Sequence, residues 1–283
     1  MTLKTIQKLF FEQLEGVHPK EEVASFFYIL CDFFLKYSRF QVSLNHETKI
    51  SEAHLSAFKS AIDRLKKQEP IQYILGETEF YGLPFKVTKD TLIPRPETEE
   101  LVAWILSDLA GNVNEYSLLD IGTGSGCIAI SLAKFVDKAS VSGIDNSAGA
   151  IQVASQNAQL NEVSVTFLEQ DVLELTSLPQ QYDIVVSNPP YVRELEKAAM
   201  KENVLDFEPE TALFVSNEDP LIFYRKIAQL AFKDLKPNGW LYFEINEYLG
   251  IEMQELVKEI GFKNSELKKD FREVPRMLKC QKI

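Results

Sequence analysis

The chain has 283 residues, of which 45% are hydrophobic and 25% charged, a composition typical of globular proteins. Its 42 acidic side chains outnumber the 30 Lys and Arg, and the resulting net charge of −12 argues against a nucleic-acid-binding surface. The three cysteines lie far apart, and no apolar run suits a membrane span or a signal peptide. We therefore expect a reduced, cytoplasmic protein with no metal site.

Residues 1–70 predict a small helical bundle. Apolar side chains recur at helical spacing in residues 3–14, 19–37 and 51–67. Ser51 can cap the last of these helices by accepting a hydrogen bond from its first turn. Three such helices can bury their apolar faces against one another.

The rest of the chain begins with a stretch rich in Pro and Gly, residues 71–99, which predicts a linker with a short β-hairpin. Residues 100–283 then alternate between strands and helices. Strands are predicted at 117–122, 139–145, 163–171, 182–187 and 239–246, and helices at 98–110, 124–135, 147–161, 219–235 and 250–262. This order predicts an α/β fold with a Rossmann-like, mostly parallel sheet, closed by a C-terminal hairpin.

A glycine-rich loop joins the first strand of this sheet to its helix. In LLDIGTGSG, the residues Gly122, Gly124 and Gly126 let the backbone turn tightly and approach a ligand closely. Asp145 ends the next strand, where a carboxylate can accept hydrogen bonds from both hydroxyls of a ribose. A tight turn without a ligand is the alternative interpretation.

The residues around this loop favour a cationic cofactor without phosphate. Cys127 occupies the position where the dinucleotide fingerprint needs glycine, and Asp120, just before the loop, would repel a pyrophosphate. S-adenosylmethionine has a ribose, an adenine and a sulfonium but no phosphate. Asp171 and Val172 follow the third strand and could hold the adenine, although Asp171 could equally cap a helix.

The string SNPPY follows the buried strand at 182–187 and suggests how a substrate is held. The side-chain oxygen of Asn188 and the carbonyl of Pro189 can accept both hydrogens of a planar NH2 group. Pro190 restricts the backbone, and Tyr191 offers a flat face for the group to lie on. Because ligands bind where the winding of such a sheet reverses, we expect NPPY to face the glycine loop. A rigid turn is the alternative.

These strings together resemble the release-factor glutamine methyltransferases of the HemK/PrmC type over nearly the whole chain. EPIQYILGETEFYG, LIPRPETEELV, DIGTGSGCIAISLA, SNPPYV and FEPETAL all match family patterns. The resemblance implies an S-adenosylmethionine-dependent enzyme that methylates the glutamine amide in the Gly-Gly-Gln tip of class I peptide-chain release factors. It also implies that the N-terminal bundle helps to dock the release factor.

The resemblance carries over to particular positions of this chain. It implies a cofactor site formed by Gly122, Thr123, Gly124, Ser125, Gly126, Asp145, Val172 and Asn188, to which the residue pattern adds Asp120 and Asp171. It implies that Asn188, Pro189, Pro190 and Tyr191 bind the glutamine, with Asn188, Pro189 and Tyr191 as the catalytic group. Asn246 and Glu273 depart from the family pattern, which has glycine at both positions. We expect both departures to lie outside the site and to affect local turns.

The sequence leaves the roles of three charged residues and two alternative functions open. Arg95, Glu97 and Glu208 could border the site or could only form structural contacts. A nucleic-acid amine methyltransferase shares the NPPY type of motif, but residues 86–283 hold 20 basic against 31 acidic side chains, which disfavours phosphate binding. A catalytically silent cofactor-binding adaptor is a third hypothesis.

Overall fold

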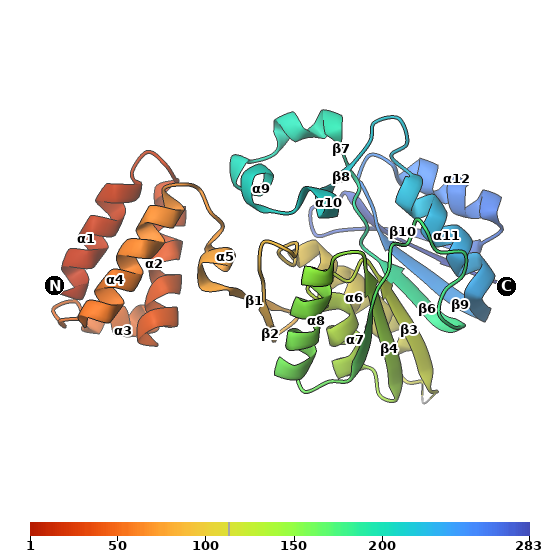
Figure 1. Ribbon diagram of the computed structural model, residues 1–283, viewed down its shortest axis with the longest axis horizontal. Coiled ribbons are helices and arrows are strands. Elements are labelled where there is room, and N and C mark those ends of the chain that lie inside the picture. The colour runs from red at the N-terminus through yellow and green to blue at the C-terminus, as the bar shows by residue number, and fades with distance from the viewer. Residues whose placement is uncertain (113) are drawn as a thin grey trace. The chain divides into compact units, whose positions relative to one another are not determined.

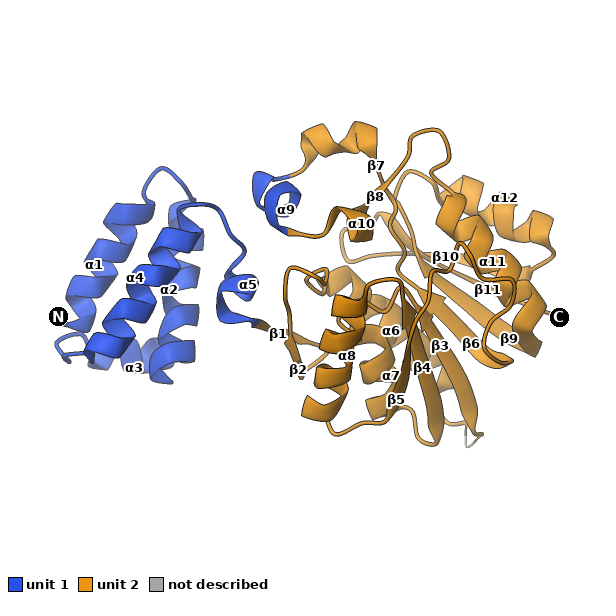
Figure 2. Ribbon diagram, viewed as in Figure 1, with its two compact units in different colours: residues 1–76, 201–207 blue, residues 77–200, 208–283 orange. Residues whose placement is uncertain are grey.

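The computed structural model describes residues 1–112 and 114–283 and divides into two compact units (Figures 1 and 2). The helical unit comprises residues 1–76 and 201–207, and the sheet unit comprises residues 77–200 and 208–283. The functional boundaries predicted at residues 70 and 99 stay predictions. In the described part of the chain no helix is both long and apolar enough to cross a membrane.

The helical unit is built on three long helices with one shared apolar core. These helices are α1 (Leu3–Leu14), α2 (Lys20–Leu35) and α4 (Glu52–Leu65). Ser51 caps α4 by accepting a hydrogen bond from the backbone N–H of His54 at 3.2 Å. The unit also contains short helices that the sequence analysis did not predict, α3 (Arg39–Leu44), α5 (Ile71–Leu75) and α9 (Glu202–Phe207). They are too short for an apolar period to develop.

The sheet unit contains a seven-stranded sheet in the order β10-β11-β9-β6-β3-β4-β5. Its strands are β3 (Tyr116–Ile121), β4 (Ala139–Asp145), β5 (Val165–Glu169), β6 (Tyr182–Ser187), β9 (Leu235–Glu244), β10 (Lys263–Lys269) and β11 (Pro275–Gln281). The first five form parallel pairs, whereas β11 pairs antiparallel with both β9 and β10. The predicted mostly parallel sheet with a closing hairpin is therefore confirmed.

Helices cover both faces of this sheet (Figure 1). The helices are α6 (Pro96–Leu109), α7 (Cys127–Phe135), α8 (Ala148–Leu160), α11 (Ile222–Asp234) and α12 (Gly250–Ile260). One apolar core includes residues of α6, α7 and α8, and the other includes residues of α11 and α12. The hairpin of β1 (Glu77–Phe80) and β2 (Leu83–Lys86) contributes Phe80 and Phe85 to the first core.

A segment of short elements after β6 had no counterpart in the sequence analysis. It contains β7 (Val192–Arg193), the 3-10 helix η1 (Glu194–Ala199), α10 (Glu210–Leu213) and β8 (Phe214–Val215) in addition to α9. β7 and β8 pair in parallel, with Val192 opposite Phe214. This pairing brings the residues that follow NPPY next to those that follow FEPETAL.

Candidate active site

The glycine loop and the NPPY string leave the sheet side by side. β3 and β6 are parallel neighbours, with Ile121 opposite Ser187, and the chain winds outward in opposite directions from this pair. The strings begin at the next residues, Gly122 and Asn188. A Cβ atom added to Gly122 would lie 3.9 Å from the carbonyl oxygen of Asn188. The predicted adjacency of the two strands is confirmed.

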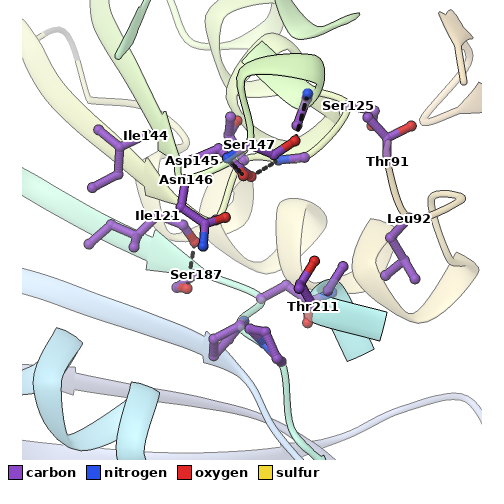
Figure 3. A pocket seen from close by; sticks show the side chains of 18 of the residues that line it. Thr91, Leu92, Ile121, Ser125, Ile144, Asp145, Asn146, Ser147, Ser187 and Thr211 are labelled. Carbon is purple, nitrogen blue, oxygen red and sulfur yellow. Dashed lines mark hydrogen bonds between the residues drawn. The ribbon is translucent and has the colours of Figure 1, made fainter. Parts of the chain in front are cut away.

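An open cavity of about 1050 Å³, including the space at its mouth, lies at this edge of the sheet (Figure 3). Of the predicted site residues, those that line it are Gly122, Thr123, Gly124, Ser125, Asp145, Asp171, Val172, Asn188, Pro189 and Pro190. A second cavity, of about 320 Å³, is lined by Tyr191 and shares Asn188 and Pro189 with the first. Asp120 and Gly126 are not among the described residues that line either cavity.

Gly126 and Asp120 instead stabilise the conformation of the glycine loop. Gly126 has a φ of +81°, and an added Cβ would lie 2.9 Å from the Cδ1 atom of Ile130, so the position requires glycine. The buried Asp120 accepts hydrogen bonds at Oδ2 from Thr123 Oγ1 at 2.7 Å and from the backbone N–H of Ala129 at 3.2 Å. Burial raises the pKa of Asp120 to about 7, against the opposing effect of these two bonds. Its contact with the cofactor stays a prediction.

Asp145 forms part of the cavity wall and is already oriented by the backbone (Figure 3). Its Oδ2 accepts a hydrogen bond from Gly124 N at 2.8 Å and its Oδ1 accepts one from Ser147 N at 3.0 Å. Burial raises the pKa of this carboxyl, while the backbone N–H groups favour its charged form. Each oxygen keeps a lone pair, so the carboxylate can still accept two hydroxyl hydrogens.

The donor and acceptor set of the larger cavity fits S-adenosylmethionine. Within the described part of the chain, the buried Oε1 of Gln170, a lining residue, has no hydrogen-bond partner and can accept one from a ligand. The charged lining residues are Asp90, Asp145, Asp171 and Arg95, so acids outnumber bases. Because Arg95 is itself paired with Glu208 at 2.6 Å, the wall suits a cation with hydroxyl and amino donors and disfavours a phosphate.

Asp171 lines the cavity, and the alternative that it caps a helix is wrong, because the described residues between β5 and β6 form a turn and no helix. Its Oδ1 accepts a hydrogen bond from the backbone N–H of Leu173 at 2.9 Å within that turn. Its other oxygen has room for a ligand donor. The adenine contact of Asp171 and Val172 therefore stays a prediction.

One buried carboxylate holds the NPPY string at both ends. Asn188 Nδ2 donates to Thr98 Oγ1 at 3.2 Å, and Thr98 Oγ1 donates to Glu244 Oε2 at 2.6 Å. The Tyr191 hydroxyl donates to the other oxygen of Glu244 at 2.9 Å. Burial raises the pKa of Glu244, while the bonds from Thr98 and Tyr191 and the charge of Arg276 act in the opposite direction.

Thr98 and Glu244 were not among the predicted site residues. A signal was present, because Glu244 interrupts the apolar run LYFEI at the carboxyl end of a predicted strand. An acid in that position is buried when the strand is central, and a buried acid needs partners. Thr98 carries no comparable signal, since a threonine near a helix N-terminus is ordinary.

One of the two departures from the family pattern contacts a predicted site residue. Asn246 Nδ2 donates to the backbone carbonyl of Tyr191 and to Glu196 Oε2, both at 3.0 Å. Asn246 is not among the described residues that line either cavity, so its position outside the site stays a prediction, although the turn after β9 passes directly beside the end of NPPY. Glu273 does affect a local turn, as expected: its φ is +63°, in the left-handed region that favours glycine.

The roles of Arg95, Glu97 and Glu208 were left open by the sequence. Arg95 both lines the cavities and forms a structural ion pair. Its partner is Glu208, whose second oxygen accepts a hydrogen bond from the backbone N–H of Ile93 at 3.2 Å. Glu208 is buried, so it attaches the FEPETAL segment to the LIPRP segment. Glu97 faces the exposed Arg272 at 3.3 Å.

Comparison with known proteins agrees with this geometry. Residues 7–76 match the model of the PrmC N-terminal domain, and residues 101–207 match that of the methyltransferase small domain. The chain is 50% identical over 281 residues to the release factor glutamine methyltransferase of Flavobacterium psychrophilum, covering 99% of each chain. It is 44% identical to the protein of the same name from Bacteroides thetaiotaomicron, covering 92% of each.

Solved structures of lower similarity share the fold. A methyltransferase from Pyrococcus furiosus superposes with a TM-score of 0.51 at 17% identity, covering 72% of this chain and 90% of that one. The catalytic domain of hMettl16 superposes with a TM-score of 0.55 at 16% identity, covering 82% of this chain and 83% of that one. The chain therefore shares the fold of these two proteins.

Proposed function

The chain belongs to the release factor glutamine methyltransferase family, and from this premise we propose its reaction and substrate. It methylates the side-chain amide nitrogen of the glutamine in the Gly-Gly-Gln tip of class I peptide-chain release factors. The observation that carries the proposal is that two adjoining cavities, one beside the glycine loop and one beside Tyr191, share Asn188 and Pro189.

S-adenosylmethionine is the cofactor, and when bound it supplies a methyl group activated by a sulfonium. The residues that would hold it are those around the larger cavity. Asp145 would accept from the ribose hydroxyls, Gln170 and Asp171 would accept from amino groups, and Val172 would pack on the adenine. The backbone of Gly122 to Gly126 would pass close to the ligand, because glycines leave no side chains in the way.

The smaller cavity would receive the glutamine. A planar amide is a poor nucleophile because its nitrogen lone pair is delocalised. The Asn188 oxygen and the Pro189 carbonyl would accept its two hydrogens and hold the nitrogen so that its lone pair faces the methyl donor. Alignment of this kind can contribute about 7–11 kcal/mol to a bimolecular step. A methylated amide cation is acidic and loses its proton readily, so the site needs no separate general base.

The helical unit would contribute to binding the release factor. Two apolar side chains on α3, Phe40 and Leu44, are 71% and 69% exposed, and Ile29 on α2 is 39% exposed. If the unit docks the protein substrate, an intact release factor should have a lower KM than a short Gly-Gly-Gln peptide. The reaction would take place in the cytoplasm, where release factors act, and no direct contact with nucleic acid is expected.

Methyl-labelled S-adenosylmethionine tests the proposal directly. The purified enzyme is incubated with a release factor, with a variant whose tip glutamine is alanine, and with DNA and RNA. Label that depends on the tip glutamine is the expected result. Label in nucleic acid would select the amine-methyltransferase alternative, and no transfer to any substrate would select the silent adaptor.

A further inference from the structure

A side-chain amide is nearly symmetric in shape, yet its two ends require opposite partners. Its oxygen accepts hydrogen bonds and its NH2 group donates them. The proposed role of Asn188 needs its oxygen to face the substrate, because the nitrogen of the substrate amide carries two hydrogens and therefore needs acceptors. A residue that fixes which end of Asn188 faces the cavities would therefore decide whether the site works.

The contacts of Thr98 fix this orientation. An ionised carboxylate only accepts hydrogen bonds, so the hydroxyls of Thr98 and Tyr191 must both give their hydrogens to Glu244, at 2.6 and 2.9 Å. Burial raises the pKa of Glu244, whereas the bonds from Thr98 and Tyr191 and the charge of Arg276 favour the ionised form in which both hydroxyls donate to it. Thr98 Oγ1 then has only lone pairs left for Asn188, so the amide must turn its Nδ2 toward Thr98, at 3.2 Å. The Oδ1 atom is left for the cavities.

Burial makes this arrangement rigid. Thr98 lines the larger cavity and Glu244 the smaller one, but they are only 2% and 1% exposed, so each has little surface at which water could replace its partner. If the amide turned over, its oxygen would meet a Thr98 oxygen that has no hydrogen to offer. Such a contact leaves two buried acceptors facing each other, which is unfavourable.

Two acceptors at the site, Asn188 Oδ1 and the Pro189 carbonyl, would attract the NH2 group of a glutamine and repel the carboxylate of a glutamate. With the amide turned over, Asn188 would present its own NH2 group. That group would oppose the hydrogens of a glutamine and would attract a glutamate. The orientation of one side chain thus sets the preference between two substrates of nearly equal size.

We propose that Thr98, anchored on Glu244, is a positioning residue that holds the Asn188 amide with its oxygen toward the substrate and so makes the site prefer glutamine over glutamate. The inference rests on the proposed function, because it takes the tip side chain of a release factor as the group that meets Asn188. It assigns Thr98 an indirect role, through Asn188, and no contact with the reacting atoms.

The test compares four enzymes: the wild type, Thr98→Val, Thr98→Ser and Tyr224→Phe. Valine keeps the shape of threonine without the hydroxyl, and serine keeps the hydroxyl. Tyr224→Phe is the matched control, because it removes a buried hydroxyl that donates to the Glu244 carbonyl and accepts from the Asn246 backbone N–H, both at 3.2 Å, and leaves the bonds of Thr98 to Asn188 and Glu244 in place. For each enzyme we would measure kcat/KM on a release factor, the Kd of S-adenosylmethionine, and the Kd values of release factors carrying Gln or Glu at the tip.

We expect Thr98→Val to lower kcat/KM about tenfold, the effect of losing one well-placed hydrogen bond. The ratio of the Glu-tip to the Gln-tip Kd should fall by a similar factor. Docking contacts cancel in this ratio because the two release factors differ only at the tip. Thr98→Ser and Tyr224→Phe should keep the wild-type ratio, and the cofactor Kd should stay within about twofold in all four.

An unchanged Gln/Glu ratio in Thr98→Val, or an equal fall in Thr98→Ser, would overturn the inference. A fall in cofactor affinity that parallels the fall in kcat/KM would mean that Thr98 is only structural. Should Thr98→Val fail to fold, Thr98→Ala makes the same comparison without the branched side chain. If the wild type methylates no glutamine, the proposed function fails, whereas the binding ratio still tests Thr98.

Discussion

Glu273 occupies a backbone conformation that a glycine would adopt at lower cost, and Glu273→Gly should therefore stabilise the protein. Its φ of +63° places it in the left-handed region, which costs a non-glycine residue about 1–2 kcal/mol. Two terms oppose the gain. Glycine loses about 0.5–1 kcal/mol more conformational entropy on folding. The substitution also removes an exposed ion pair with Lys269 at 3.7 Å, and exposed pairs contribute at most about 1 kcal/mol.

Because Glu273→Ala loses the same ion pair, the strain and entropy terms leave Glu273→Gly more stable than that variant by about 0.5–1 kcal/mol, and the lost pair takes up to about 1 kcal/mol from the gain over the wild type. For a chain of this length the difference between the two variants corresponds to about 1–4 °C in Tm, measured by calorimetry. The backbone N–H of Glu273 keeps its bond to the Asp270 carbonyl, since glycine has the same N–H. Glu273→Ala is the control, because it removes the same ion pair but keeps a Cβ atom. If Glu273→Gly and Glu273→Ala melt at the same temperature, glycine relieves no backbone strain at this turn and the reasoning is refuted.

The other predictions concern the site. Asn188→Ala should keep the wild-type Tm but lose at least about 100-fold in kcat, by analogy with removal of one positioned polar group from an active site; turnover near the wild-type rate would contradict the proposed role. Asp145→Ala should weaken S-adenosylmethionine binding about 10- to 100-fold by calorimetry, because bonds to a charged acceptor are lost, whereas an unchanged Kd would exclude the ribose contact. Asp120 has a folded-state pKa raised to about 7, so it binds its proton more tightly in the folded chain, and its contribution to stability is present below about pH 4 and is lost as the pH rises to 7. Denaturant unfolding of Asp120→Asn should lack that part of the pH dependence, and identical pH profiles for the two proteins would refute the assignment.

Local pattern was sufficient to predict most of the sheet unit. The apolar strands β3 and β6 and the strings that follow them can be found from short stretches of sequence, and parallel topology then places Gly122 beside Asn188. The contact between Thr98 and Glu244 could not be found in this way, because it joins residues 146 positions apart through tertiary packing. The short elements between Val192 and Val215 were missed for a related reason. They are held by contacts such as that of Arg95 with Glu208, and carry no periodic pattern of their own.

Asn246 shows a different limit of sequence reasoning. Its departure from the family pattern was visible in the sequence, but its effect depends on which segment passes next to it. In the folded chain its side chain donates to both Tyr191 and Glu196, so one substitution ties the last residue of NPPY to the 3-10 helix that follows. The sequence alone does not reveal the neighbours of a turn.

The grouping of residues 201–207 with the helical unit has a practical consequence for dissecting this protein. The polypeptide passes from one unit to the other at three points, after Gly76, Met200 and Phe207, and Gln68 donates a hydrogen bond to Glu202 at 2.8 Å within the helical unit. A truncation that starts at Glu77 would therefore keep α9 while discarding the helices it belongs with. Severing the two units cleanly would require replacing α9 as well as removing the N-terminal residues.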